Sequence, residues 1–328
     1  MQTVTVTAQE AGQRLDRFLG KYLDQAPKSF LYKMMRKKNI TLNGKKCAGN
    51  ERLCAGDAIR LFLSDDTISA FSSSFGKQTA GHCGRSLKRE LILYEDDQIL
   101  LINKPVGMLS QKAKEGDISA VELLTSYLME SGQLSGQDRA VFRPGICNRL
   151  DRNTSGILAA GKSTAALQEL NRFFKERTVE KYYLCLVDGV IRDSSHLNGY
   201  LIKDTHTNKV QVIQKEVPNS TRIETAFRPL CAGEDATLLE VHLITGKSHQ
   251  IRAHLASAGH PLIGDHKYGS RRVNEPYQKE YGLKSQLLHA HRLVMPESKG
   301  ILSYLDGHEF TAKPPALFCK ICRDKGVM

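Results

Sequence analysis

Apolar residues recur with helical spacing near the start of the chain. Five of them lie at positions i, i+3, i+4, i+7 and i+8, which predicts one face of a short amphipathic helix: Leu15, Phe18, Leu19, Tyr22 and Leu23. Pro27 ends this helix, and a second helix over residues 29–38 turns four basic residues outward: Lys33, Arg36, Lys37 and Lys38. A short apolar strand then enters an Asn43-Gly44 turn, which is typical of a β-hairpin. Residues 1–63 are therefore predicted to form a small α+β module.

The composition changes between residues 64 and 86. This segment is rich in Ser, Gly, Asp and Thr, and it shows no hydrophobic period longer than a turn. We expect a flexible linker, which would let the first module search for a site while it stays tethered to the rest of the chain.

Short apolar strands and amphipathic helices alternate from residue 87 to residue 328. The predicted strands cover residues 91–93, 99–102, 157–160, 182–187 and 237–244. The predicted helices cover residues 119–131, 163–177 and 247–258. Gly259 suits the position just after the last helix. The mixture predicts an α+β domain of about 240 residues.

The charge of the chain favours a polyanionic partner. Lys and Arg outnumber Asp and Glu by 47 to 35, which gives a net charge of +12. Residues 1–63 contain 12 basic and 5 acidic residues, so their net charge of +7 is more than half of the total excess. Such a surplus attracts nucleic acid without regard to sequence. The basic cluster at residues 33–38 is either part of this attraction or a plain solvated helix face.

Hydropathy and cysteine usage indicate a cytoplasmic protein. Hydrophobic residues make up 41% of the chain, and none of its apolar stretches approaches the roughly 18 residues that span a bilayer. The first residues, Met1 to Thr7, lack the charged and apolar regions of a secretory signal. The eight cysteines are scattered, so we expect free thiols in a reducing compartment.

Metal and nucleotide motifs are incomplete. Cys319-x-x-Cys322 resembles half of a zinc site, but a second pair at matching spacing is missing. Three histidines and an acid lie close together in sequence without the spacing of a metal site: His249, His254, His260 and Asp265. Dinucleotide-binding and nucleophile-elbow patterns are also missing. We therefore expect no metal and no cofactor.

Residues Gly156 to Ser163 match the letters of the Walker A phosphate loop, so an ATPase is an alternative. That loop follows an apolar strand, whereas residues 149–155 are polar and turn-like. Ile157 and Leu158 suit a buried strand better than an anion-binding loop. The pattern disfavours the ATPase.

A single carboxylate occupies the polar turn just before this apolar run. Asp151 lies between Arg149 and Arg152, in the segment Asn148-Arg149-Leu150-Asp151-Arg152-Asn153-Thr154-Ser155-Gly156. A lone acid placed between two cations, next to a buried strand, is a candidate reactive group.

Four segments, in order, resemble the motifs of the RluA family of pseudouridine synthases: residues 101–108, 148–156, 181–189 and 239–269. Residues 288–293 continue the likeness, and residues 1–63 resemble the small alpha-L RNA-binding domain. The resemblance implies a mainly antiparallel pseudouridine synthase fold over residues 87–328. It also implies isomerisation of uridine to pseudouridine in RNA, without metal or cofactor.

The same resemblance assigns roles within the site. Asp151 matches the essential aspartate, Arg252 the basic residue that pairs with it and keeps it ionised, and Tyr183 the tyrosine that stacks on the target base. Tyr182 should point to the opposite face of its strand. RNA contacts are expected from Arg149, which would fill the space of the flipped base, and from three residues at the entrance: Lys104, Lys247 and His249.

Two positions depart from the family pattern. Asn148 stands where the family usually has His, and Lys247 where it usually has Arg. We expect altered packing or substrate grip rather than lost activity. The appended alpha-L domain favours large-subunit ribosomal RNA as substrate, with transfer RNA as the alternative. A catalytically idle RNA-binding assembly factor is the alternative from another class, and we expect a monomer.

Overall fold

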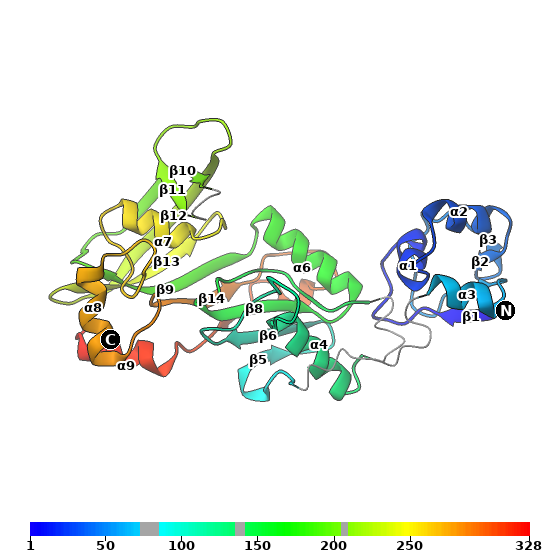
Figure 1. Cartoon of the computed structure of the whole chain (residues 1–328), viewed down its shortest axis with the longest axis horizontal. Coiled ribbons are helices and arrows are strands. Elements are labelled where there is room, and N and C mark those ends of the chain that lie inside the picture. The colour runs from blue at the N-terminus through cyan, green and yellow to red at the C-terminus, as the bar shows by residue number, and fades with distance from the viewer. Residues whose placement is uncertain (73–84, 135–141, 205–208) are drawn as a thin grey trace.

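The computed structural model describes residues 1–72, 85–134, 142–204 and 209–328. A small N-terminal module lies at one end of the molecule, beside a much larger domain built on one extended sheet (Figure 1). Among the described residues, no helix is both long and apolar enough to cross a bilayer.

The N-terminal module packs its helices against a four-stranded antiparallel sheet of order β1-β4-β2-β3. Its first elements are β1 (Gln2–Thr5), α1 (Leu15–Tyr22), α2 (Lys28–Arg36), β2 (Ile40–Leu42), β3 (Lys45–Lys46) and β4 (Ala58–Leu61). The predicted apolar face of α1 is buried, which confirms the first helix. The second helix and the hairpin at Asn43-Gly44 are also confirmed. The four basic residues of α2 and its C-terminal end are exposed, as expected.

A third helix, α3 (Asp65–Phe71), completes this module. The Ser64 hydroxyl accepts a hydrogen bond from the Thr67 amide and caps the helix. Ile68 is buried in the module's core, and the rings of Phe71 and Phe30 lie 4.7 Å apart. The expected linker is therefore wrong for residues 64–72, because two apolar side chains one turn apart attach them to the core. Residues 73–84 of that expected linker lie outside the described residues.

The larger domain is built on an eleven-stranded sheet. Its main path runs β11-β10-β12-β13-β9-β14-β8-β6-β5, while β15 pairs with β14 and β7 with β8. The strands are β5 (Ile92–Glu95), β6 (Ile99–Lys104), β7 (Gly145–Ile146), β8 (Ser155–Gly161), β9 (Glu180–Asp188), β10 (Ser195–Lys203), β11 (Val210–Ile213), β12 (Thr221–Ala232), β13 (Ala236–Leu243), β14 (Leu288–Val294) and β15 (Glu309–Thr311). Within the described part of the chain, β14 and β8 form the one parallel pair. The mixed, mainly antiparallel α+β fold is confirmed.

Helices cover both faces of this sheet: α4 (Ala120–Glu130), α6 (Thr164–Glu176), α7 (Gln250–Ser257), α8 (Arg271–Tyr281) and α9 (Ala316–Asp324), with short 3-10 turns η1 (Arg89–Leu91) and η2 (Ser303–Leu305). Alternate residues of β8 separate two cores. Leu158 packs with α4 and α7, whereas Ile157 packs with α6. The helix predicted over residues 247–258 begins only at Gln250, because His249 has a left-handed backbone (φ 56°).

The Walker A string is a strand rather than a phosphate loop. All seven residues of β8 are buried, and its last one, Gly161, would place an added Cβ 2.6 Å from the backbone of Leu167. The lysine of the string, Lys162, donates to the Glu95 carboxylate at 2.9 Å. A bound phosphate would find neither an open loop nor a free lysine here, which removes the ATPase alternative.

Candidate active site

A cleft of about 910 Å3 opens where the turn before β8 approaches β9, α6 and α7. Its walls include six of the predicted site residues: Arg149, Asp151, Tyr183, Lys247, His249 and Arg252. The basic cluster of α2 belongs to the N-terminal module and does not line this cleft, and Lys104 is also missing from its walls. Segments far apart in the sequence therefore supply one site.

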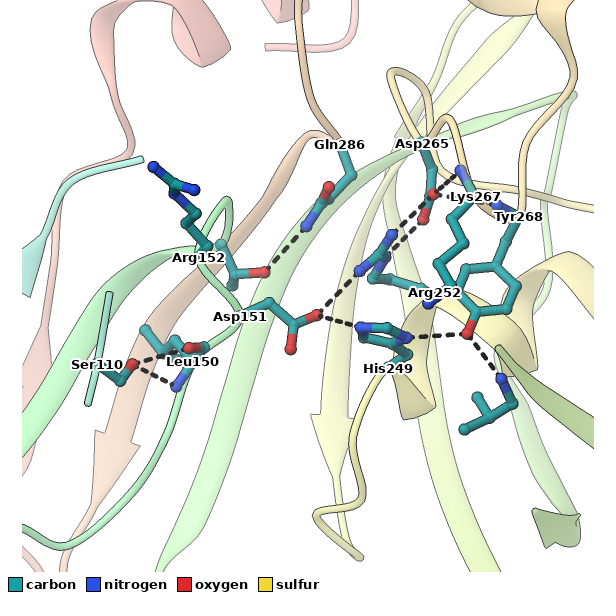
Figure 2. A network of polar contacts seen from close by, with 12 residues as sticks. Ser110, Leu150, Asp151, Arg152, His249, Arg252, Asp265, Lys267, Tyr268 and Gln286 are labelled. Carbon is teal, nitrogen blue, oxygen red and sulfur yellow. Dashed lines mark hydrogen bonds and ion pairs between the residues drawn. The ribbon is translucent and has the colours of Figure 1, made fainter. Parts of the chain in front are cut away.

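Asp151 lies on a turn whose backbone is held from several sides. The Ser110 hydroxyl donates to the Leu150 carbonyl at 2.7 Å and accepts from the Leu150 amide at 3.1 Å. The Thr154 amide donates to the Asp151 carbonyl, and the Thr154 hydroxyl accepts from Gln286 at 3.3 Å (Figure 2). These bonds fix the direction in which the turn presents its carboxylate.

Lys104 is a buried support of this turn, so its prediction as a phosphate contact at the entrance is wrong. Its side chain is 0% exposed, and its ammonium donates to the carbonyls of Pro105, Met108 and Arg152 at 3.0, 2.9 and 3.1 Å. Three carbonyls match the three protons of an ammonium. Burial lowers the pKa of Lys104 to about 8. A phosphate in the cleft cannot reach a group that is enclosed in this way.

Asn148 pairs with the strand that follows the turn. Its amide nitrogen donates to the Ile157 carbonyl at 3.0 Å, and its amide oxygen accepts from the Ala159 amide at 2.9 Å. A single asparagine side chain thus bonds β8 as a neighbouring strand would. The departure from the family's histidine is compatible with an intact turn.

The Asp151 carboxylate is held by an arginine that is itself held from behind. Nη1 of Arg252 donates to Oδ2 of Asp151 at 3.0 Å, while Nε and Nη2 of Arg252 donate to Asp265 at 2.7 and 3.0 Å (Figure 2). Arg252 and Asp265 are 9% and 0% exposed, whereas Asp151 is 30% exposed. The predicted pairing of Asp151 with Arg252 is present, with the arginine fixed in a bidentate fork.

Asp265 keeps its charge inside the protein. Burial opposes that charge, but hydrogen bonds from Arg252 and from the amides of Lys267 and Tyr268 together lower the pKa of Asp265. Burial likewise opposes the charge of Arg252, and its two carboxylate partners raise its pKa. The cleft therefore contains a permanent cation beside Asp151.

His249 lies on the other side of the same carboxylate oxygen. Its Nε2 is 3.8 Å from Oδ2 of Asp151, and its Nδ1 is 2.9 Å from the Tyr268 hydroxyl. That hydroxyl accepts from the Val210 amide, so Tyr268 connects the His249 ring with β11. The pKa of His249 is lowered, chiefly by burial, which favours the neutral ring.

Tyr183 forms a buried wall of the cleft. It is 6% exposed, and its pKa is raised by burial and by Asp151, so the phenol keeps its proton. Tyr182 points to the other face of β9, as predicted from the strand period. There it stacks on His242 at 4.6 Å and lies under the guanidinium of Arg292 at 3.7 Å.

The sequence reading missed the supporting residues Asp265, Tyr268 and Gln250. Gln250 is 2% exposed and bonds the turn before α7 through Thr245 and the amide of Lys247. Asp265 was considered only as an incomplete metal ligand. The sequence offered only an acid thirteen positions after Arg252, and the contact between the two side chains became visible only in the fold.

Oδ1 of Asp151 makes no hydrogen bond to a described residue, and Figure 2 shows it pointing away from Arg252. Arg149 and Lys247 are exposed on the walls around it. In the described ranges, no group of three or more His, Cys, Asp or Glu residues is arranged to hold a metal. The arrangement offers one oriented carboxylate, a fixed cation and an aromatic wall.

Comparisons with known proteins identify the family of the chain. Residues 98–257 match the profile of the RNA pseudouridylate synthase family. Because curated relatives are also more than 30% identical over most of the chain, the protein belongs to this family, whose members are isomerases acting on RNA. The RluA-type resemblance of the motifs is confirmed.

Two relatives are similar over nearly the whole length. The ribosomal large subunit pseudouridine synthase C of Vibrio vulnificus is 35% identical over 88% of this chain and 87% of its own. The protein of the same name in Escherichia coli strain K12 is 33% identical with the same coverage. A solved structure of human RNA pseudouridylate synthase domain containing 4 matches 71% of this chain and 92% of its own, at 21% identity and a TM-score of 0.57, which supports the fold.

Proposed function

We propose that this protein isomerises specific uridines to pseudouridine in large-subunit ribosomal RNA, with Asp151 as the catalytic carboxylate. The observation that carries the proposal is the Asp151 carboxylate, bonded through one oxygen to Arg252 and open to the cleft through the other. The substrate is supported by the names of the relatives, which act on the ribosomal large subunit.

The reaction conserves every atom of the nucleotide. The bond between N1 of uracil and C1′ of ribose breaks, a bond between C5 and C1′ forms, C5 loses a proton and N1 gains one. One carboxylate that acts on the sugar or the ring serves this chemistry, in place of the acid and base pair of a hydrolase. Asp151 has the required exposure, and Arg252 keeps its orientation.

Tyr183 would stack on the uracil during this rearrangement. Its ring borders the cleft, and its retained proton allows it to donate a hydrogen bond to the base. A uridine in folded RNA must leave its stack to reach Asp151, and the exposed Arg149 is placed to fill the vacated space. Lys247 and His249 would bind the adjacent phosphates.

The basic N-terminal module would supply affinity away from the target base. Its exposed cluster of Lys33, Arg36, Lys37 and Lys38 suits contact with the RNA backbone. A transfer RNA substrate is less well supported, because the relatives carry ribosomal names. An idle assembly factor would gain nothing from an anion placed beside phosphates. A ribosomal substrate agrees with the expected cytoplasmic location, which stays a prediction together with the monomeric state.

Gene deletion followed by pseudouridine mapping tests the proposal. We expect one or more pseudouridines to disappear from large-subunit ribosomal RNA and to return with the wild-type gene. Asp151→Asn should restore none of them, although the purified variant should still bind RNA because its basic residues are intact. Exposed Asp235→Asn is the matched control and should restore them all. Loss of sites in transfer RNA alone would overturn the substrate, and restoration by Asp151→Asn would overturn the catalytic assignment.

A further inference from the structure

One face of α6 lines two neighbouring cavities. Its residues follow helical spacing i, i+3, i+4, i+7, i+10 and i+11: Thr164, Leu167, Gln168, Asn171, Phe174 and Lys175. The opposite face packs on the sheet through Leu170 and Phe173. Asn171 belongs to the walls of both the active-site cleft and a second cavity of about 380 Å3. The two hollows are therefore successive parts of one surface path along the helix.

The second cavity lies where the N-terminal module meets the larger domain. Lys21 of the module and Arg143 of the larger domain contribute to its walls. The Gln9 carbonyl accepts from the Thr164 amide at 2.8 Å, and the Gln9 side chain donates to the Gln133 carbonyl. The module thus contacts the start of α6, as Figure 1 shows, while the other end of α6 reaches the active-site cleft.

The walls of the two cavities are strongly basic. Together they contain ten Lys or Arg residues against two acids, Asp151 and Asp24. Burial and the nearby Arg177 lower the pKa of Lys181 at the cleft end. Loss of hydration in the groove, followed by repulsion from Arg143 and Arg17, lowers the pKa of Lys21 at the junction. Some of these cations have acidic partners, such as Lys112 with Glu122 and Arg252 with Asp265, but cations still outnumber acids on these walls, which favours a bound polyanion.

Phe174 is a half-buried aromatic ring that packs on one side against the core beneath α6 and lies on the other side among these cations. It borders the cleft beside Lys175, which is exposed and forms no ion pair with a described residue. Arg143, at the junction, is likewise exposed and without an acidic partner in the described part of the chain. Cations for phosphates with an aromatic ring for a base are the combination that binds single-stranded nucleic acid.

We propose that single-stranded RNA next to the target uridine runs along this face of α6, from the active-site cleft to the junction with the N-terminal module. Arg143 and Lys175 would bind its phosphates, and Phe174 would stack on a base. The proposal rests on the proposed function and adds a path for the flanking RNA. The 13 residues of α6 span about 20 Å, which corresponds to about six stacked nucleotides.

The test compares two double variants of the full chain. Arg143→Gln with Lys175→Gln removes two exposed cations from the path. Arg271→Gln with Lys279→Gln removes two exposed cations from α8, at the other end of the molecule (Figure 1), and is the matched control. Binding is measured by fluorescence anisotropy at several salt concentrations, with oligouridines of about four and about twelve nucleotides.

We expect the α6 variant to bind the longer oligouridine several-fold more weakly, with a salt slope reduced by about 1.4 for two lost phosphate contacts. The shorter oligouridine should show a smaller loss, and the α8 control should match the wild type on both. The proposed RNA path would be overturned if the α6 and α8 variants lost the same affinity, or if the α6 variant lost the same affinity for the short and the long oligouridine. Thermal melting of each variant verifies its folding. The binding assay does not depend on catalysis. Pseudouridine formation by the wild-type protein is measured separately, so a failure of the proposed function can be distinguished from a failure of the RNA path.

Discussion

At the residue scale, Arg252 connects the reactive group with the interior. One of its nitrogens holds Asp151, and two others are held by Asp265 behind it. A guanidinium fixed in this way cannot swing, so the Asp151 carboxylate has a fixed partner at a fixed angle. Because Asp265 is 0% exposed, we expect it to act as a positioning residue through Arg252 rather than to touch the substrate.

Asp265→Asn tests that role. The side-chain amide of Asn has one oxygen in place of two, so it cannot accept the hydrogen bonds from both Nε and Nη2 of Arg252 in the same geometry. Arg252 would then be held less firmly beside Asp151, and we expect kcat to fall by about 10²-fold with a smaller change in KM. Breaking a fully buried ion pair should also lower the free energy of unfolding by about 3–5 kcal/mol. Steady-state kinetics and urea unfolding measure the two effects.

Glu275→Gln on α8 serves as the control: its side chain is 42% exposed and forms only surface ion pairs, so kcat should stay unchanged and the free energy of unfolding should change by less than about 1 kcal/mol. A merely structural Asp265 would lower stability while kcat per folded molecule stayed constant, and that result would contradict the positioning role. Partial recovery of kcat in Asp265→Glu, which restores the charge, would support it further.

At this scale the sequence identified residues whose signal is local. Asp151 stood out as a lone acid in a polar turn, and the predicted contact with Arg252 is present, whereas the catalytic role of Asp151 stays a prediction. The assignment of Lys104 as a phosphate contact was wrong, because the family resemblance does not show which groups enclose a side chain. The three carbonyl partners of Lys104 come partly from Arg152, which is 48 positions away. Which atoms enclose a side chain is decided by the fold.

At the scale of elements, the β8–β14 pair supports the catalytic turn. Ser155, four positions after Asp151, pairs with His289 in the parallel register. Nδ1 of His289 accepts from the Ser155 hydroxyl at 2.9 Å, while Nε2 donates to the Ala312 carbonyl at 3.0 Å. The next residue, Gly156, leaves no room for a side chain, since an added Cβ would lie 2.2 Å from the Ala290 carbonyl oxygen.

His289 should make stability sensitive to acid. It is 0% exposed, and burial lowers its pKa to about 4 from an ordinary 6.5. As pH falls below 6.5, His289 takes up a proton in the unfolded chain but not in the folded protein. The neutral His289 therefore contributes its full share of stability above pH 6.5, and this share is lost as pH falls toward 4. We expect about 2 kcal/mol of lost unfolding free energy at pH 5 relative to pH 7 from this residue. Urea unfolding at both pH values measures it.

The comparison variants separate this residue from other titrating groups. His289→Gln should lower stability at pH 7 and show a difference between the two pH values that is smaller by about 2 kcal/mol. Exposed His196→Gln should keep the wild-type difference. An unchanged difference in His289→Gln would show that His289 is not the sensor.

Hydrophobic period predicted some elements and missed others. It gave β5, β6, β8, β9 and β13 and the helices α1, α2, α4 and α6, but the sequence analysis named neither the remaining six strands of the large sheet nor α8 and α9. Helix α3 was missed, because its apolar residues Ile68 and Phe71 are too few to produce a clear period. The first turn expected for α7 is replaced by a left-handed His249, which bonds to Tyr268 nineteen positions away.

At the scale of the whole molecule, the N-terminal module should fold as residues 1–72. Removing α3 exposes the core face that Ile68 and Phe71 cover, so a fragment of residues 1–63 should melt at a lower temperature than a fragment of residues 1–72. Within the longer fragment, Ile68→Ala should cost about 2–5 kcal/mol of unfolding free energy.

Exposed Ser69→Ala is the matched control and should leave the melting temperature of that fragment unchanged. Circular dichroism follows the unfolding of the two fragments and of both variants. Equal melting of the two fragments would place the end of the module at residue 63 after all.

The sequence by itself determined the class of fold and the family, and it singled out Asp151 as the candidate catalytic residue. These depend on hydrophobic period and on short motifs, which are local properties of a chain. The tertiary structure decided that Lys104 supports the turn from inside, that Asp265 fixes Arg252, and that α6 connects the cleft with the basic module. Each of these depends on groups that are distant in sequence becoming neighbours, and burial and direction belong only to the folded chain.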